Sequence, residues 1–196
     1  MKNIKNILAL PLLLLVLFSG CNSNDDGFYN ETYIQAGNLV SIETLPQYQV
    51  NDVLFVNAVI PRLLQELNQN NLTDVRQSTG NAESFHFSFM LEKQSPEGVW
   101  TYVDVTNIYV ESAGDAVAGS FVQAIAQYDT AADAYYFRGG LKFAEPGIYR
   151  LSFGYNSTSL NKVELRSNST GNNLRMNISS EANNLDAQGN YSFTVN

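Results

Sequence analysis

His86 is the only histidine in the chain, so any Ser-His-Asp triad or histidine-centred metal site would have to be built on it. It alternates with Phe85, Phe87 and Phe89 in a run that predicts a half-buried strand, which places the imidazole opposite the three rings. No Gly-x-Ser-x-Gly motif, the usual setting of a hydrolase nucleophile, accompanies it. We therefore interpret His86 as an outward-facing strand residue.

Acidic side chains are the second source of chemistry, and those on or near predicted strands are Glu92, Glu97, Asp104 and Glu111. Glycoside hydrolysis needs two carboxyl groups placed across a sugar. The positions of these four acids in the sequence do not indicate that any two of them lie close together. The sequence therefore predicts no catalytic residue, and we expect the protein not to be an enzyme. A carboxylate-dependent glycan hydrolase is the less favoured alternative.

Calcium requires several oxygen ligands that converge on one loop. Asp129 with Asp133, or Asp115 beside Gly114, offers too few, and the chain has no Asp-x-Asp-x-Asp-Gly loop. The sequence predicts neither a bound metal nor another cofactor.

Exposed aromatic rings could form a platform on which the apolar faces of sugars stack. Trp100 lies beside a Pro-Gly turn, where a binding ring could project. The alternative is that these rings are ordinary core and edge residues of a β-domain. The candidates for a glycan-binding platform are Trp100, Tyr102, Tyr109, Tyr135 and Tyr136.

A short segment resembles a modification site. Asp129-Thr130-Ala131 is similar to the Asp-Ser/Thr-apolar acceptor motif of Bacteroidota O-glycosylation, and that resemblance implies that Thr130 is the modified residue. The motif falls in a segment predicted to be an exposed loop.

The elements that position these residues are predicted to be strands. The clearest are residues 53–60, 85–91, 121–128, 135–141 and 148–153, and polar turns rich in Gly, Asn and Pro separate them. Leu63, Leu64 and Leu67 have helical spacing, which predicts one short helix or a turn within residues 62–68. We expect an all-β fold, an antiparallel sandwich of about 8–10 strands with one short helix.

One local sequence sharpens this expectation. Pro146-Gly147-Ile148-Tyr149-Arg150-Leu151 resembles the turn and strand of immunoglobulin-like domains that carry a tyrosine corner, in which the hydroxyl bonds back to the preceding backbone. Residues 189–195 show a similar pattern, a glycine followed by alternating aromatic or apolar and polar residues, and are predicted to form the last strand of the domain. The resemblance implies an immunoglobulin-like β-sandwich.

The amino-terminal 21 residues predict export. Lys2 and Lys5 precede an apolar run, Ile7 to Phe18, which is too short to span a bilayer and is typical of a signal peptide. Phe18-Ser19-Gly20-Cys21 resembles the lipobox of bacterial lipoproteins, although Phe18 stands where a smaller aliphatic residue is commoner. The resemblance implies cleavage after residue 20 and lipid on Cys21, the only cysteine.

We therefore expect three parts: a lipoprotein signal peptide over residues 1–20, a lipidated polar tether over 21–37 and a β-sandwich domain over 38–196. The tether carries Asp25-Asp26 shortly after Cys21, which resembles the surface-export signal of Bacteroidota lipoproteins. This implies an outer-membrane lipoprotein on the cell surface; whether it faces outward or into the periplasm stays open.

Charge excludes one class of partner. Without its two signal-peptide lysines the chain has nine basic and 19 acidic residues, a formal charge of −10, whereas nucleic-acid binding needs a basic surface. We expect a non-catalytic cell-envelope protein held at the membrane through Cys21, a surface-displayed binding or adhesion module for a glycan or for another envelope protein. The alternatives are a structural or accessory envelope protein without a small ligand, and the hydrolase. The sequence does not fix the oligomeric state.

Overall fold

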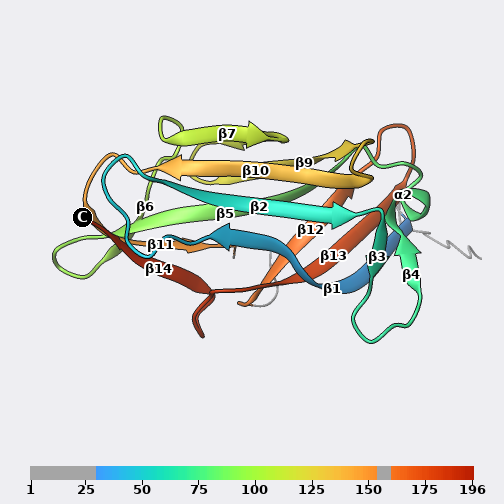
Figure 1. Ribbon diagram of the computed structural model, residues 1–196, viewed down its shortest axis with the longest axis horizontal. Coiled ribbons are helices and arrows are strands. Elements are labelled where there is room, and N and C mark those ends of the chain that lie inside the picture. Colours follow the sequence, from blue (N-terminus) through green and yellow to red (C-terminus); the bar gives the residue numbers. More distant parts are fainter. Residues whose placement is uncertain (1–29, 154–159) are drawn as a thin grey trace, which may run out of the picture.

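The computed structural model describes residues 30–153 and 160–196, and almost all of their regular structure is β-strand (Figure 1). The strands are β1 (Asn30–Glu43), β2 (Val53–Pro61), β3 (Leu63–Gln65), β4 (Leu72–Asp74), β5 (Ser84–Gln94), β6 (Trp100–Tyr102), β7 (Tyr109–Ala113), β8 (Asp115–Ala118), β9 (Val122–Asp129), β10 (Ala134–Lys142), β11 (Gly147–Ser152), β12 (Lys162–Asn168), β13 (Leu174–Ala182) and β14 (Asn190–Val195). One helical turn, α2 (Val75–Ser78), follows β4. The all-β prediction is confirmed.

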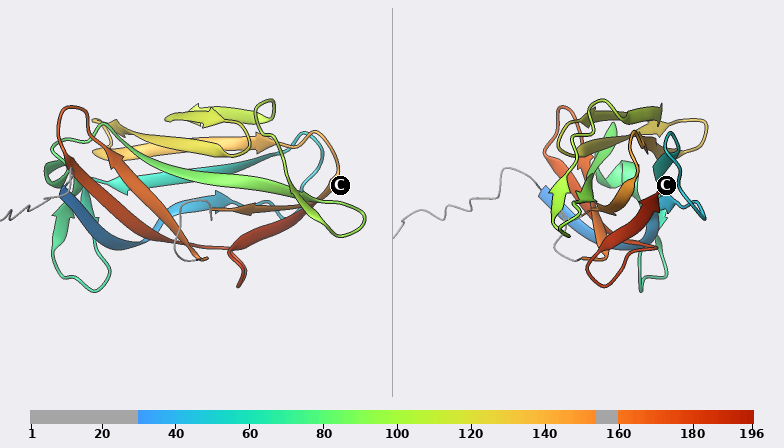
Figure 2. Two further views of the ribbon diagram at one scale, coloured as in Figure 1. Left: turned by 180° about the vertical axis from the view of Figure 1, so that it is seen from behind. Right: turned by 90° about the vertical axis from the view of Figure 1, so that its left-hand side faces the viewer.

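The immunoglobulin-like sandwich is wrong, because the main sheet closes on itself. Seven strands pair in the cyclic order β5-β12-β13-β1-β2-β10-β9, and β9 returns to β5 with Phe85 opposite Ala126 and Phe89 opposite Val122. The result is a seven-stranded barrel, whose rounded section is visible in the right panel of Figure 2. A closed sheet has no open edges along its ring, whereas each sheet of a sandwich has two.

Strand β5 closes the ring because its first half pairs with both β9 and β12, and it also belongs to a second sheet. Its first half, from Ser84 to Phe89, pairs with β9 inside the barrel, and its second half pairs with β11 through Leu91 and Leu151. Strand β14 then adds to β11, with Tyr149 opposite Phe193. The segment predicted to be a closing strand thus extends the second sheet and lies outside the barrel ring.

Strand β1 also changes partner along its length. Residues 30–37 run parallel to β13, and after an irregularity at 37–40 the strand runs antiparallel to β2. Asn38 adopts a positive φ of 56° there, a backbone conformation that asparagine tolerates better than most residues. Residues 30–37, which the sequence analysis assigns to the tether, therefore form the first half of a barrel strand.

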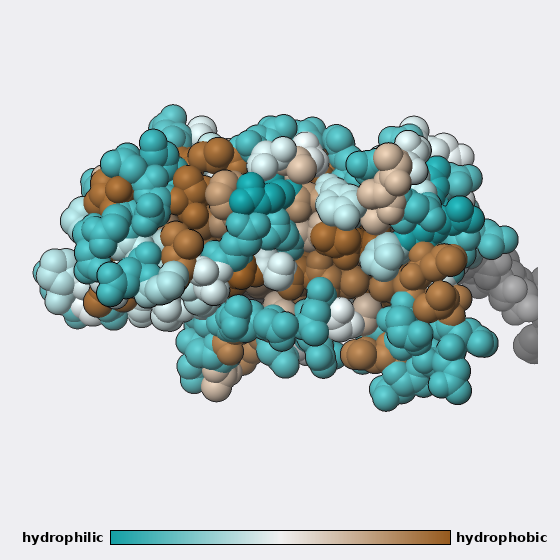
Figure 3. Space-filling model, viewed as in Figure 1, coloured by the Kyte–Doolittle hydropathy of each residue, from teal (hydrophilic) through white to brown (hydrophobic). Residues whose placement is uncertain are grey.

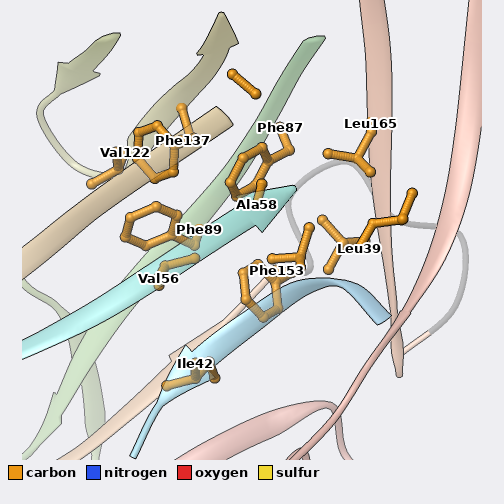
Figure 4. Close-up of a cluster of buried hydrophobic side chains, with 14 of the residues drawn as sticks. Leu39, Ile42, Val56, Ala58, Phe87, Phe89, Val122, Phe137, Phe153 and Leu165 are labelled. Atoms are coloured by element: carbon orange, nitrogen blue, oxygen red, sulfur yellow. The ribbon is translucent and has the colours of Figure 1, made fainter. Parts of the chain in front are cut away.

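The barrel interior is filled by alternate residues of its strands. Phe87 and Phe137 meet edge to face with ring centroids 5.3 Å apart, and Phe85 meets Tyr135 in the same way at 4.9 Å. Figure 4 shows Phe87, Phe89 and Phe137 surrounded by aliphatic side chains from β1, β2, β9 and β12. Such edge-to-face pairs add favourable electrostatics to the burial of apolar area.

The tyrosine corner is confirmed although the fold that suggested it is not. Tyr149 Oη donates to the carbonyl oxygen of Glu145 at 3.0 Å, across the Pro146-Gly147 turn. The ring lies in a second aromatic cluster with Tyr48, Phe143 and Phe193 at one end of the barrel. The tyrosine corner depends only on a turn and the strand that follows it, so it does not require the immunoglobulin topology.

The predicted helix over 62–68 is wrong. Leu64 is buried while Leu63 and Gln65 are exposed, the alternation of a strand, and these residues form β3 paired with β4. The helical turn comes later, at Val75–Ser78, where the Asp74 side chain accepts a hydrogen bond from Gln77 N at 3.0 Å. Tertiary pairing overrides the helical spacing of the three leucines.

Candidate functional site

A polar groove of about 600 Å³ lies on the outside of the barrel. Five barrel strands build it: β1, β13, β12, β5 and β9. Because strand side chains alternate between faces, the residues beside the buried phenylalanines of β5 point outward into it. Its lining comprises Glu31, Tyr33, His86, Phe87, Ser88, Phe121, Gln123, Glu164, Arg166, Ser167, Asn168, Arg175 and Asn177.

Four of these residues form one row across the groove. Tyr33 of β1 lies opposite Asn177 of β13, Asn177 lies opposite Arg166 of β12, and Arg166 lies opposite His86 of β5. Neighbouring strands are about 4.8 Å apart, so the row spans about 14 Å. The barrel pairing therefore aligns a phenol, an amide, a guanidinium and an imidazole on one outer surface.

Carboxylates tie this row together. Asn177 Nδ2 donates to Glu31 Oε2 at 3.3 Å, and the Tyr33 hydroxyl donates to the same oxygen. Arg166 Nε donates to Glu164 Oε1 at 3.2 Å. These bonds restrict the side chains of Tyr33, Asn177 and Arg166, three of the four members of the row, and side chains that are already ordered lose less entropy when they bind a partner.

Arg175 forms the neighbouring part of the groove. It lies opposite Glu31 in the β1–β13 pairing, and its Nη1 donates to the carbonyl oxygen of Ser167 at 3.2 Å. Together with Arg166 it brings two positive charges to the groove, and Glu31 and Glu164 bring two negative charges. The groove thus has no net charge, although the chain as a whole is acidic.

The ionisable rings of the groove are held neutral. Burial lowers the pKa of His86, and the positive charge of Arg175 lowers this pKa further. The hydrogen bond to Glu31 raises the pKa of Tyr33. At neutral pH the imidazole therefore offers one donor and one acceptor, with Nε2 3.0 Å from Ser84 Oγ.

The five predicted platform aromatics do not converge. Tyr135 is in the barrel core, where its hydroxyl donates to Ala82 O at 2.9 Å. Tyr109 is half-buried against β10, and its hydroxyl has no hydrogen-bond partner among the described residues. Tyr136 points outward from β10 in line with Gln127 and Ser84, whereas β6 pairs with residues 92–94 at the other end of β5.

Trp100 and Tyr102 do share one face of β6. Tyr102 is 67% exposed, whereas Trp100 is half-buried with the Arg150 guanidinium 4.4 Å from its ring centroid. Arg150 Nε in turn donates to Glu92 Oε2 at 2.6 Å. One ring face of Trp100 is therefore occupied by a protein cation, and this pair is less suited to stacking than the sequence suggests.

The remaining predicted residues lie apart from one another. Thr130 is exposed in the turn between β9 and β10, as predicted, and Asp129 caps that turn by accepting from Ala131 N at 2.8 Å. Within residues 30–153 and 160–196, no group of three or more His, Cys, Asp or Glu side chains could hold a metal ion. Cys21 and the predicted signal peptide lie outside the described residues.

The sequence predicts the outward face of His86 but not its neighbours in the groove. Glu31 and Tyr33 fall within the predicted tether, although Glu31, Tyr33 and Gln35 alternate with Ile34 and Ala36 as in a half-buried strand. The same alternation in β12 places Glu164 and Arg166 on the outer face of the strand, whereas Val163 and Leu165 point into the core. The alternation of apolar and polar residues is visible in the sequence of each strand. The strand order that brings these outward residues together is not.

Comparison of the chain with known protein families, with curated proteins and with solved structures finds no match in any of the three. No helix among the described residues is long and apolar enough to cross a membrane.

Proposed function

We propose that this protein is a lipid-anchored binding module of the cell envelope and that its groove takes a carbohydrate chain. The observation that carries the proposal is the row Tyr33-Asn177-Arg166-His86, aligned across four barrel strands and bordered by two carboxylates. The lipobox-like sequence that ends at Cys21 supplies the anchor in this proposal.

The hydrogen-bonding character of the groove supports a sugar. A sugar hydroxyl both donates and accepts, so it is best met by donors and acceptors side by side. The guanidinium of Arg166 and the amide of Asn177 supply donors, Glu31 and Glu164 supply acceptors, and Tyr33 presents a ring that is 70% exposed. The balance of charge favours a neutral glycan over a phosphorylated or strongly acidic ligand.

The arrangement of the carboxylates supports binding over hydrolysis. Glu31 and Glu164 lie two strands apart and, through the pairing of Gln35 with Ser179, four residues apart along the strands. Glu31 accepts hydrogen bonds from Asn177 and Tyr33, and Glu164 accepts one from Arg166, so both carboxylates are engaged in the hydrogen-bond network of the groove itself.

A glycan array probed with the purified protein tests the proposal. We expect a neutral oligosaccharide to bind, and Arg166→Ala and Asn177→Ala each to weaken it about tenfold, the loss expected for a hydrogen bond to a charged or amide group. The matched control is Arg62→Ala, which removes an exposed arginine paired with Asp74 at 2.8 Å outside the groove.

Two results would contradict the proposal. One is an array without a bound glycan, and the other is glycan binding that the groove variants leave unchanged. Shortening of the bound glycan during incubation, abolished by Glu31→Gln or Glu164→Gln, would replace binding with hydrolysis.

A further inference from the structure

The β3–β4 hairpin exposes leucines in a short polar protrusion. Leu63 and Leu72 lie on the outer face of the hairpin and are 51% and 53% exposed, while Leu64 on the inner face is buried. Leu67 is also partly exposed, at 37%, and its amide donates to Gln35 O at 2.8 Å. Apolar side chains gathered on one exposed hairpin are typical of an interaction surface.

This hairpin lies at the end of the barrel where the described chain begins. Asn30 N donates to Asn173 O at 2.9 Å, and the adjacent Asn172 contacts the turn after α2, which itself follows β4. Figures 1 and 2 show the start of β1, α2 and the hairpin at the same end of the molecule. Figure 3 shows brown, hydrophobic surface at this end, above a teal polar tip.

The length of the preceding chain brings this end close to a bilayer. Asn30 comes nine positions after Cys21 in the sequence, and even a fully extended chain of that length spans no more than about 32 Å. If Cys21 carries lipid, as in the proposed function, the hairpin lies at the end of the domain that the tether holds near the headgroups.

We infer that the outer face of the β3–β4 hairpin rests on the bilayer, with Leu63 and Leu72 at the boundary between headgroups and acyl chains. The inference rests on the lipid anchor of the proposed function. The hairpin tip between the leucines, residues 68–71, carries only amide side chains, which suit the hydrated headgroup layer. Arg62 pairs with Asp74 at 2.8 Å, which leaves the charge of Glu66 on this hairpin, so the surface has no excess of positive charge that would favour anionic over zwitterionic lipid.

Site-specific fluorescence on the lipidated full chain tests this contact. Because Cys21 is the only cysteine and its thiol is consumed by lipidation, Leu63→Cys and Leu72→Cys each introduce a unique site for the dye NBD. The chains are reconstituted in phosphatidylcholine vesicles that contain lipid brominated near the headgroup. The control is Val99→Cys, a 59% exposed residue in the turn between β5 and β6, outside the hairpin.

We expect blue-shifted NBD emission at 63 and 72 and quenching about threefold stronger than at 99, because dyes at the interface meet brominated chains. Equal quenching at all three positions would overturn the contact. Two further readouts keep the two claims distinct: NBD uptake by the wild-type chain, or failure of the chain to float with vesicles, would overturn the anchor and the contact together. Flotation with equal quenching would overturn the contact alone.

Discussion

Tyr33 and Asn177 lie directly opposite each other on the parallel strands β1 and β13, and both donate a hydrogen bond to the same oxygen, Glu31 Oε2. One carboxylate thus fixes two adjacent members of the groove row. Glu31 and Tyr33 are two residues apart on β1, whereas Asn177 is 146 positions from Glu31, so only the pairing of β1 with β13 brings the amide to this carboxylate.

We expect Glu31→Ala to weaken glycan binding about tenfold while it changes the free energy of unfolding by less than about 1 kcal/mol, because the bonds it removes are near the surface. Glu43→Ala is the control, since Glu43 also accepts from an asparagine and an arginine, Asn57 and Arg138, but outside the groove. Titration calorimetry with the best glycan from the array measures the effect. Equal affinities of the two variants would contradict a positioning role for Glu31.

The tyrosine corner predicts a loss of stability in Tyr149→Phe. The variant keeps the ring among Phe143 and Phe193 but removes the donor to Glu145 O, a loss of about 1 kcal/mol. Urea unfolding measures it against Tyr102→Phe, which alters a largely exposed hydroxyl. The prediction fails if both variants match the wild type.

The partly buried pair of Glu92 and Arg150 predicts a larger effect. Glu92→Ala leaves the Arg150 guanidinium without the carboxylate at 2.6 Å, and we expect a loss of about 2 kcal/mol. Glu145→Ala removes a more exposed carboxylate, 2.6 Å from Lys93 Nζ, and we expect a smaller loss because water screens an exposed pair. Urea unfolding of both variants decides; a Glu145→Ala loss as large as that of Glu92→Ala would disprove the ranking.

Gly114 joins β7 to β8, and its position leaves no room for a side chain. Its φ is +80°, and an added Cβ would lie 2.7 Å from Ile125 O and 2.9 Å from Tyr136 O, both backbone atoms. We expect Gly114→Ala to cost about 2–3 kcal/mol in unfolding free energy. Gly119→Ala has open space around the new Cβ and serves as the control. Similar melting temperatures for the two would show that β7 and β8 do not pack as described.

His86 predicts a pH dependence of stability. Its pKa is lower in the folded chain than the ordinary 6.5, so the unfolded chain binds a proton that the folded chain does not as the pH falls below that value. We expect the advantage of the wild type over His86→Asn to be full above about pH 6.5 and to shrink as the pH falls from there. Urea unfolding at about pH 7.5 and about pH 5 measures this difference. A difference independent of pH would contradict a buried, neutral imidazole.

The sequence alone was sufficient for the local features. Alternation of apolar and polar residues predicts β5 and the outward face of His86, Glu145-Pro146-Gly147 predicts the turn before Tyr149, and the paired strands around Asp129 follow from their patterns. Each of these depends on residues only a few positions apart, where backbone preference and side-chain period decide the structure.

The tertiary structure decided the closure of the barrel and with it the groove. The bonds from β5 to both β9 and β12, and from β1 to β13, join segments that are dozens to more than a hundred residues apart. Such pairings depend on how whole strands share a core, since many strand orders bury the same apolar faces equally well. The sequence shows that the chain contains Tyr33, Asn177, Arg166 and His86. It does not show that they form one row, which exists only because the sheet closes.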